Sequence, residues 1–206
     1  MSKKPGVSTF IKRWTRPFDP DGEVLRKCAA KEGITPDEMK AIWNKKGEES
    51  IAKGNAIHEF LDLRLKGAMY EGVRLPEYDA IDELISKYEI LDTETWINYR
   101  NEFNLNGRYD LRLMVHGREA IADLKTGKAA DATVWENLLP PFDKVGASKL
   151  QMAKLQVCIY CRIQGISDGY VLPVGETGFY LIPCKEEDFA IADAMLKLRL
   201  EEINGN

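Results

Sequence analysis

In the middle of the chain the hydrophobic residues alternate with polar ones, whereas on both sides of this segment they recur at helical spacing. Apolar side chains alternate over 97–105 and over 109–115, and a third apolar run covers 120–126. Alternation places every second side chain on the same face of a strand. Asn106-Gly107 and His116-Gly117 separate the three runs and suit two-residue turns, whose residues adopt positive φ. The segment therefore predicts a three-stranded antiparallel meander.

Helical patterns flank this meander in the sequence. The hydrophobic spacing and the capping signals predict helices at about 22–32, 36–45, 48–66, 77–88, 148–164 and 185–203. Two short strands are expected at 169–174 and 178–184, after a long irregular connection over 127–147. These elements predict an α/β fold in which a central mixed sheet, made of the meander and two further strands, is flanked by helices.

The length and composition limit the kind of protein. A chain of 206 residues fits one domain, in which we expect an N-terminal helical segment (1–47), a core (48–184) and a C-terminal helix (185–206). No apolar run is long enough to cross a bilayer and the start lacks the apolar region of a signal peptide, which predicts a cytoplasmic protein.

The distribution of charge leaves two interpretations open. The net charge of −4 argues against a protein that simply coats DNA. However, residues 1–16 and 144–164 contain basic residues and no acidic ones, whereas 71–94 is acidic. This asymmetry predicts either one face that attracts phosphates or an ordinary mixed surface.

Two aspartates and a lysine on the meander are candidates for a catalytic centre. If His116-Gly117 is a two-residue turn, the numbers of paired residues sum to 233, so that Asp110 lies opposite Asp123 and Lys125 shares the face of Asp123. Like charges that face each other are destabilising, and a bound cation such as Mg²⁺ would explain the pair. A turn at Gly117-Arg118 would instead pair Asp110 with Lys125, as an ordinary ion pair on a solvated face.

A cation held at this place would have a chemical use. A bound divalent metal polarises a phosphate group and lowers the pKa of an attacking water. Lys125 could orient that water or offset the charge that develops on the phosphate oxygens. The pattern thus indicates metal-dependent hydrolysis of phosphodiester bonds.

Four motifs, taken in order, resemble those of the PD-(D/E)XK nuclease superfamily in its RecB-like branch. They are GNAIH at 54–58, GRYD at 107–110, ADLKTG at 122–127 and QVCIY at 156–160. The likeness covers roughly residues 48–184. Upstream, VSTFI at 7–11 together with Trp43 is similar to phage exonucleases and to the mitochondrial genome maintenance exonuclease.

This resemblance implies a restriction-endonuclease-like central sheet, a catalytic core over 48–184, and Mg²⁺ or Mn²⁺ as the cofactor. The implied metal ligands are His58, Asp110, Asp123 and the carbonyl group of Leu124. The implied catalytic residues are Asp110, Asp123, Lys125, Gln156 and Tyr160. Gln156 and Tyr160 are one helical turn apart, which is compatible with one shared helix face.

Five further residues are predicted to contact DNA: Gly54, Arg108, Lys128, Trp135 and Lys149. Gly54 precedes His58 by one turn, where its missing side chain could let a backbone approach. Lys149 precedes Gln156 by two turns on the same face. Trp135, together with Phe142, could form a stacking surface for single-stranded DNA, or both could anchor the long connection to the core.

Each of these residues also has an ordinary structural interpretation. His58 could be a core or surface histidine of an amphipathic helix, Tyr160 a core residue and Gln156 a surface residue. Gly54 inside a helix costs roughly 1 kcal/mol relative to alanine, which calls for a packing or functional reason. The four cysteines match in number the iron–sulfur ligands of some RecB-like nucleases. Two of them lie inside a predicted helix, so buried thiols are the favoured interpretation.

Together these features predict a metal-dependent DNA exonuclease that acts on single strands or on DNA ends. The expected setting is DNA processing, recombination or repair in a bacterium or a phage-infected host. No membrane association is expected, and a replication or recombination protein is a candidate partner. The alternatives are a structure-specific endonuclease and a catalytically silent nucleic-acid-binding module, and the presence of both Asp123 and Lys125 argues against the silent module.

Overall fold

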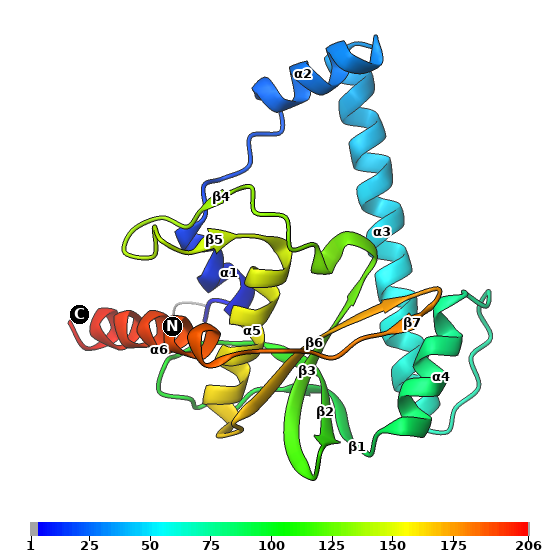
Figure 1. Cartoon of the computed structure of the whole chain (residues 1–206), viewed down its shortest axis with the longest axis vertical. Helices are drawn as coiled ribbons and strands as arrows, with labels where there is room; N and C mark the ends of the chain where they lie inside the picture. The colour runs from blue at the N-terminus through cyan, green and yellow to red at the C-terminus, as the bar shows by residue number, and fades with distance from the viewer. Residues whose placement is uncertain (1–3, 206) are drawn as a thin grey trace.

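A central mixed β-sheet is the scaffold of the protein (Figure 1). The structure, a computed structural model, describes residues 4–205 apart from the side chain of Ala129. The sheet has the strand order β1-β2-β3-β6-β7, and β8 also pairs with β6. β1, β2 and β3 are antiparallel, whereas β3 and β6 are parallel. The bounds are β1 (Ile90–Trp96), β2 (Arg108–Val115), β3 (Arg118–Thr126), β6 (Asp168–Gly175), β7 (Gly178–Phe179) and β8 (Ile182–Pro183).

Helices cover both faces of this sheet, and each face has its own hydrophobic cluster. One cluster contains residues of α1 (Val7–Ile11), α5 (Lys149–Gln164) and α6 (Glu186–Asn204). The other contains residues of α3 (Pro36–Leu65) and α4 (Glu77–Lys87). Successive residues of β3 belong to opposite clusters, Ile121 to the first and Ala122 to the second. The fold is therefore α/β with a mixed sheet flanked by helices, as the sequence predicts.

The hairpin between β2 and β3 has the predicted two-residue turn. His116 and Gly117 adopt φ angles of 51° and 77°, as such a turn requires. From Leu111 opposite Ala122 to Val115 opposite Arg118, the paired residue numbers sum to 233. The predicted register is confirmed over these pairs, and the alternative turn at Gly117-Arg118 is excluded. The predicted pair of Asp110 and Asp123 is not among them.

The prediction of the first strand is wrong. The strand that pairs with β2 is β1 (Ile90–Trp96), and 97–105 belongs to an irregular connection. Asn106-Gly107 forms no hairpin turn, because the backbone of Asn106 instead exchanges hydrogen bonds with residues 5 and 7 of the N-terminal segment. The apolar residues of the connection serve its own packing, since Ile97 and Leu105 are buried.

The two helices predicted at 36–45 and 48–66 are one continuous helix, α3. It begins with a capping box formed by Thr35 and Glu38, and it continues through Gly47. A glycine in a helix costs about 1 kcal/mol, but it ends the helix only where it adopts the left-handed conformation of a C-terminal cap. Gly47 is not among the described residues with positive φ, so the helix runs on.

The N-terminal half of α3 extends away from the sheet and carries α2 (Glu23–Glu32) at its far end (Figure 1). Leu25, Ala29 and Met39 form a small separate cluster there. The expected boundary between an N-terminal segment (1–47) and a core (48–184) consequently falls inside α3 rather than between two elements.

The connection between β3 and α5 contains short elements where an irregular segment was predicted. They are η2 (Gly127–Ala130) and a two-stranded sheet of β4 (Glu136–Asn137) and β5 (Gly146–Ala147). Phe142 anchors this connection, because its ring packs against Trp14 with centroids 5.2 Å apart. Trp14 belongs to η1 (Lys12–Trp14). Trp135, by contrast, is 51% exposed, so only Phe142 is shown to anchor the connection to the core.

The remaining helix predictions are confirmed. α2, α4, α5 and α6 agree with the predicted ranges to within one residue at each end. β6 lies where a strand is predicted, while the strand predicted at 178–184 is divided into β7 and β8. In the part of the chain that the structure describes, no helix has the length and apolarity needed to cross a bilayer.

Candidate metal centre

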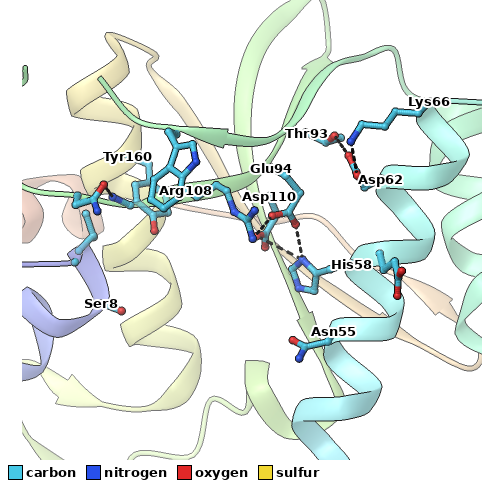
Figure 2. Close-up of a pocket in the computed structure, with 16 residues that line it drawn as sticks. Ser8, Asn55, His58, Asp62, Lys66, Thr93, Glu94, Arg108, Asp110 and Tyr160 are labelled. Carbon is cyan, nitrogen blue, oxygen red and sulfur yellow. Dashed lines mark hydrogen bonds and ion pairs between the residues drawn. The ribbon is translucent and has the colours of Figure 1, made fainter. Parts of the chain in front are cut away.

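Three side chains from three different elements meet beside the sheet. His58 on α3, Glu94 on β1 and Asp110 on β2 offer ligand atoms that all lie within 4.8 Å of one another. His58 Nδ1 is 3.0 Å from Glu94 Oε1 and 3.6 Å from Asp110 Oδ1, and the imidazole points at both carboxylates (Figure 2). Imidazole nitrogen and carboxylate oxygen are common ligands of divalent cations. This group of three is the candidate metal centre.

Core packing of α3 sets the position of His58. Its neighbours Ile57 and Leu61 are 0% and 1% exposed and pack against the sheet. His58 itself lies where the core meets solvent, with 29% of its side chain exposed. The helix thus places the imidazole at the end of the sheet rather than within the core.

Asp110 lies at an irregularity of β2. Residues two apart on a regular strand share a face, but Tyr109 packs in the cluster on the α5 side and Leu111 in the cluster on the α3 side. The β2–β3 ladder begins only at Leu111. Asp110 Oδ2 instead accepts a hydrogen bond of 2.6 Å from the backbone N–H of Leu124. The carboxylate is thereby held between the two strands.

Glu94 occupies the matching position on β1. Thr93 and Thr95 pair with Leu111 and Tyr109, so Glu94 stands opposite Asp110. Its φ of 49° is uncommon for a residue other than glycine, and such strain is often found at functional sites. The Glu94 carboxylate forms an ion pair with Arg108, with 2.7 Å between Oε2 and Nη2.

Sequence reasoning missed Glu94 as a member of this cluster. The signal that could have found it is the run ILDTETW over 90–96, whose β-branched and aromatic residues favour a strand. A correct strand would still not have predicted its pairing. Residues 97–107 connect β1 to β2 as a long irregular segment rather than a two-residue hairpin turn, so no count along the chain gives the register.

Burial and neighbouring charges shift the pKa values of two residues of the cluster, Asp110 and His58. Burial, followed by the neighbouring charge of Asp123, raises the pKa of Asp110 to about 7, although His58 and Lys125 act in the opposite direction. Burial also acts to lower the pKa of His58, but its hydrogen bond to Glu94 and the surrounding carboxylates outweigh that effect and raise the pKa. A divalent cation bound here would favour the charged form of the buried Asp110 carboxyl.

Beside the cluster, the structure brings together four of the predicted catalytic residues. Asp123 is 2% exposed, and its Oδ2 contacts the ammonium group of Lys125. Gln156 Nε2 lies 3.4 Å from Asp123 Oδ1 and donates to the hydroxyl oxygen of Tyr160 at 3.0 Å. α5 therefore presents two polar side chains, one turn apart, to the end of β3.

Asp123 lies beside the candidate metal centre but is not one of its three residues. It is not one of the described residues whose ligand atoms lie within 4.8 Å of one another, yet its charge acts on both Asp110 and His58. The N–H of Leu124 points at Asp110, and the carbonyl group of a strand residue points to the same edge as its N–H. The four ligands implied by the resemblance are thus neighbours here, with Glu94 in addition.

Lys125 is suited to act as a fixed positive charge. Burial lowers the pKa of its ammonium group, but the carboxylates of Asp123 and Asp110 outweigh that effect and raise the pKa above its usual range. The group therefore stays protonated at neutral pH, which suits it to stabilise negative charge rather than to accept a proton.

Tyr160 explains the glycine of the GRYD motif. A Cβ atom added to Gly107 would lie 2.7 Å from Tyr160 Cε1, closer than real contacts allow. The glycine is required because the ring packs against the backbone, and not because of the hairpin turn that the sequence suggested. Burial raises the pKa of the Tyr160 hydroxyl, which therefore stays protonated.

A cleft of about 910 Å³ opens at the candidate metal centre. Its lining comes from α1, α3, β1, β2 and α5, and includes Ser8, Asp62 and Tyr160 (Figure 2). This volume falls within the range of ligand-binding clefts.

One of the five predicted DNA-binding residues lines this cleft, and the other four do not. Among the described residues, the cleft lining includes Arg108 but not Gly54, Lys128, Trp135 or Lys149. A Cβ atom at Gly54 would meet Thr126 at an ordinary 3.6 Å, so space alone does not require the glycine. Lys128 and Lys149 are exposed. Hydrogen bonds from Thr133 lower the pKa of Asp131, and the charges of these two lysines add to that effect, so both lie near Asp131.

The four cysteines are free and lie in two separate places. Cys28 packs in the small cluster between α2 and α3. Cys161 and Cys184 both lie against Gly169 of β6, and Cys158 neighbours Cys184.

Comparison with known proteins assigns no family. No protein-family model and no curated protein matches the chain. One solved structure that matches is titled "Crystal structure of SSO0001". The alignment covers 96% of this chain and 77% of the chain in that structure, at 15% sequence identity and a TM-score of 0.30. A TM-score this low carries no functional argument, so function must be inferred from the site.

Asp110→Asn should stabilise the protein when no metal is present. The pKa of this carboxyl is raised from its usual value to about 7, so its effect on stability is most favourable at low pH and is lost as the pH rises through about 7. At pH 8, removing the buried charge should raise the free energy of unfolding by about 1–3 kcal/mol and the melting temperature by several degrees.

The measurement is thermal unfolding of both proteins in EDTA at pH 8 and pH 5, and then with excess Mg²⁺. The difference should shrink at pH 5, where the wild-type carboxyl is protonated. It should reverse with Mg²⁺, which only the wild type binds tightly. A variant less stable than the wild type in EDTA at pH 8 would contradict this account of Asp110.

Proposed function

We propose that this protein is a metal-dependent deoxyribonuclease that hydrolyses phosphodiester bonds at the cluster of His58, Glu94 and Asp110. One observation carries the proposal: three ligand-type side chains lie beside an ion pair between the buried Asp123 and the half-buried Lys125. Ordinary surface ion pairs do not account for this, because both aspartates are buried, and burial together with the charge of Asp123 raises the pKa of Asp110. The order of the four PD-(D/E)XK-like motifs adds independent support.

Each residue has a role that fits its surroundings. A divalent cation bound by the cluster would polarise the scissile phosphate and lower the pKa of an attacking water. Lys125, kept protonated by Asp123, offsets negative charge on the phosphate oxygens. Gln156 bridges Asp123 and Tyr160 and so keeps the Asp123–Lys125 pair in place.

The substrate that we propose is DNA, either single strands or ends, degraded from an end. The resemblance to phage exonucleases and to the mitochondrial genome maintenance exonuclease favours this choice over a structure-specific endonuclease. The Asp123–Lys125 pair favours it over a catalytically silent nucleic-acid-binding module. Such an activity implies work on DNA in the cytoplasm of a bacterium or a phage-infected host, alongside a replication or recombination protein.

The test is a degradation assay on single- and double-stranded linear DNA labelled at either end, and on covalently closed circles, with Mg²⁺, Mn²⁺ or EDTA. An exonuclease should shorten the linear DNA only with a cation and leave the circles closed, whereas opened circles would indicate an endonuclease. Asp110→Asn is the matched control, because it removes one ligand charge and keeps the shape of the side chain. Intact linear DNA with both cations, or equal rates for this variant and the wild type, would exclude the proposal.

A further inference from the structure

Trp96 is a large aromatic side chain that the fold leaves open to the cleft. It is 62% exposed and lines the same cleft as the candidate metal centre. Its partner across the strands is Arg108, whose guanidinium carbon lies 5.9 Å from the centroid of the indole ring. An exposed aromatic ring beside a cation in a cleft is a common arrangement for binding the base and phosphate of a nucleotide.

Both residues are placed by the same strands that carry the metal ligands. Trp96 follows Glu94 by two residues on β1, and Arg108 precedes Asp110 by two residues on β2. Two strand residues span about 7 Å, a length comparable to one nucleotide of an extended strand. The indole and the guanidinium therefore lie about one nucleotide away from the point where a phosphate would meet the cation.

Arg108 is held in position before any substrate arrives. Its Nη2 atom lies 2.7 Å from Glu94 Oε2, and Figure 2 shows its guanidinium directed at the acidic cluster. About half of the side chain, 51%, nevertheless remains exposed. A guanidinium has five N–H donors in a planar fork, so one contact to Glu94 leaves others for the oxygens of a phosphate.

We propose that Trp96 and Arg108 form a nucleotide subsite next to the metal centre, in which the indole stacks on an unpaired base and Arg108 binds the phosphate of that nucleotide. The proposal rests on the proposed nuclease function and defines its substrate more narrowly. A base inside a duplex is stacked on both sides and offers no free face to the indole, whereas a base in a single strand or at a frayed end does. The subsite therefore selects unpaired nucleotides beside the cleaved bond.

The experiment compares Trp96 variants on two single-stranded oligonucleotides, one intact and one lacking the base at the nucleotide next to the first cleaved bond. For the wild type, loss of that base should raise KM about tenfold, as expected for one base stacked on an aromatic side chain. Trp96→Ala should raise KM for the intact strand by a similar factor and should respond little to the missing base. Trp96→Phe keeps an aromatic plane and should restore most of the affinity.

Two controls separate stacking from structural damage. Tyr180→Ala removes an equally exposed aromatic residue, 68% exposed, that is not among the described residues lining the cleft, and it should leave KM unchanged. Trp96→Ala should bind Mn²⁺ as tightly as the wild type. If the missing base costs the wild type and Trp96→Ala equal factors, or if Trp96→Ala loses Mn²⁺ affinity, the subsite is excluded.

The outcomes for the subsite and for the nuclease function are distinct. If the wild type and Trp96→Ala cut DNA equally well, the proposed function stands and the subsite is excluded. If the wild type cuts no DNA, the proposed function is excluded. In that case, anisotropy measured with both oligonucleotides, labelled with fluorescein, decides the subsite: weaker binding on loss of either the base or the indole supports it, and unchanged binding excludes it.

Discussion

Lys125→Ala should slow Mg²⁺-dependent DNA hydrolysis a hundred- to a thousandfold, the loss typical when one electrostatic stabiliser of a transition state is removed. The Lys125 side chain is only 24% exposed, and its ammonium group contacts Asp123. Despite its burial, the two nearby aspartates raise its pKa, so the wild-type group is positively charged at neutral pH. The rate loss would be measured as kcat/KM on end-labelled linear DNA.

The metal should remain bound in this variant. Removing a positive charge next to Asp110 and Asp123 leaves more negative potential for a cation, so calorimetric affinity for Mn²⁺ should be equal or higher. In EDTA the variant should be less stable, because Asp123 loses its buried charge partner, at a cost of up to about 3–5 kcal/mol. Added Mg²⁺ should restore part of that loss.

Lys87→Ala is the control, since Lys87 is an exposed lysine at the end of α4. It should change neither the rate nor the metal affinity. Two results for Lys125→Ala would contradict the assigned role: hydrolysis at the wild-type rate, or loss of metal binding together with activity. The second result would indicate that Lys125 maintains the site rather than stabilising charge on the substrate.

Glu94→Gln should weaken Mn²⁺ binding by more than the 10- to 100-fold that loss of an outer-sphere partner costs. Glu94 lies 3.0 Å from His58 and belongs to the group of three with ligand atoms within 4.8 Å. Glutamine preserves the shape and the contact to the imidazole but removes the charge that attracts the cation. Calorimetric titration at pH 7.5 measures the loss directly, and activity should recover in part at high Mn²⁺ concentration.

Glu59→Gln is the matched control for this change. Glu59 lines the same cleft, follows His58 directly on α3 and is exposed, but it is not part of the described cluster. Its loss lowers the negative potential of the cleft without removing a ligand, so affinity should change little. Unchanged affinity in Glu94→Gln would show that the cation is held by the set implied by the resemblance, His58, Asp110, Asp123 and the Leu124 carbonyl, without Glu94.

Local sequence alone determined the β2–β3 hairpin. His116 and Gly117 form a turn of two residues, and turn length sets the register of the strands that it joins. Counting from the turn was therefore enough to bring Asp110 close to Asp123 and to place Lys125 beside them. The helices α4, α5 and α6 were predictable for a similar reason, because their hydrophobic period and their ends depend on residues close in sequence.

Only the tertiary structure decided the membership of the candidate metal centre. Glu94 reaches Asp110 across a long irregular connection, 97–107, that is not a two-residue hairpin turn, and the irregularity of β2 at Asp110 reflects packing on both faces of the sheet. The need for glycine at position 107 likewise comes from Tyr160, which lies on a helix much later in the chain. Turns and helical periods are properties of neighbouring residues, whereas these contacts depend on how α3, β1, β2 and α5 pack together.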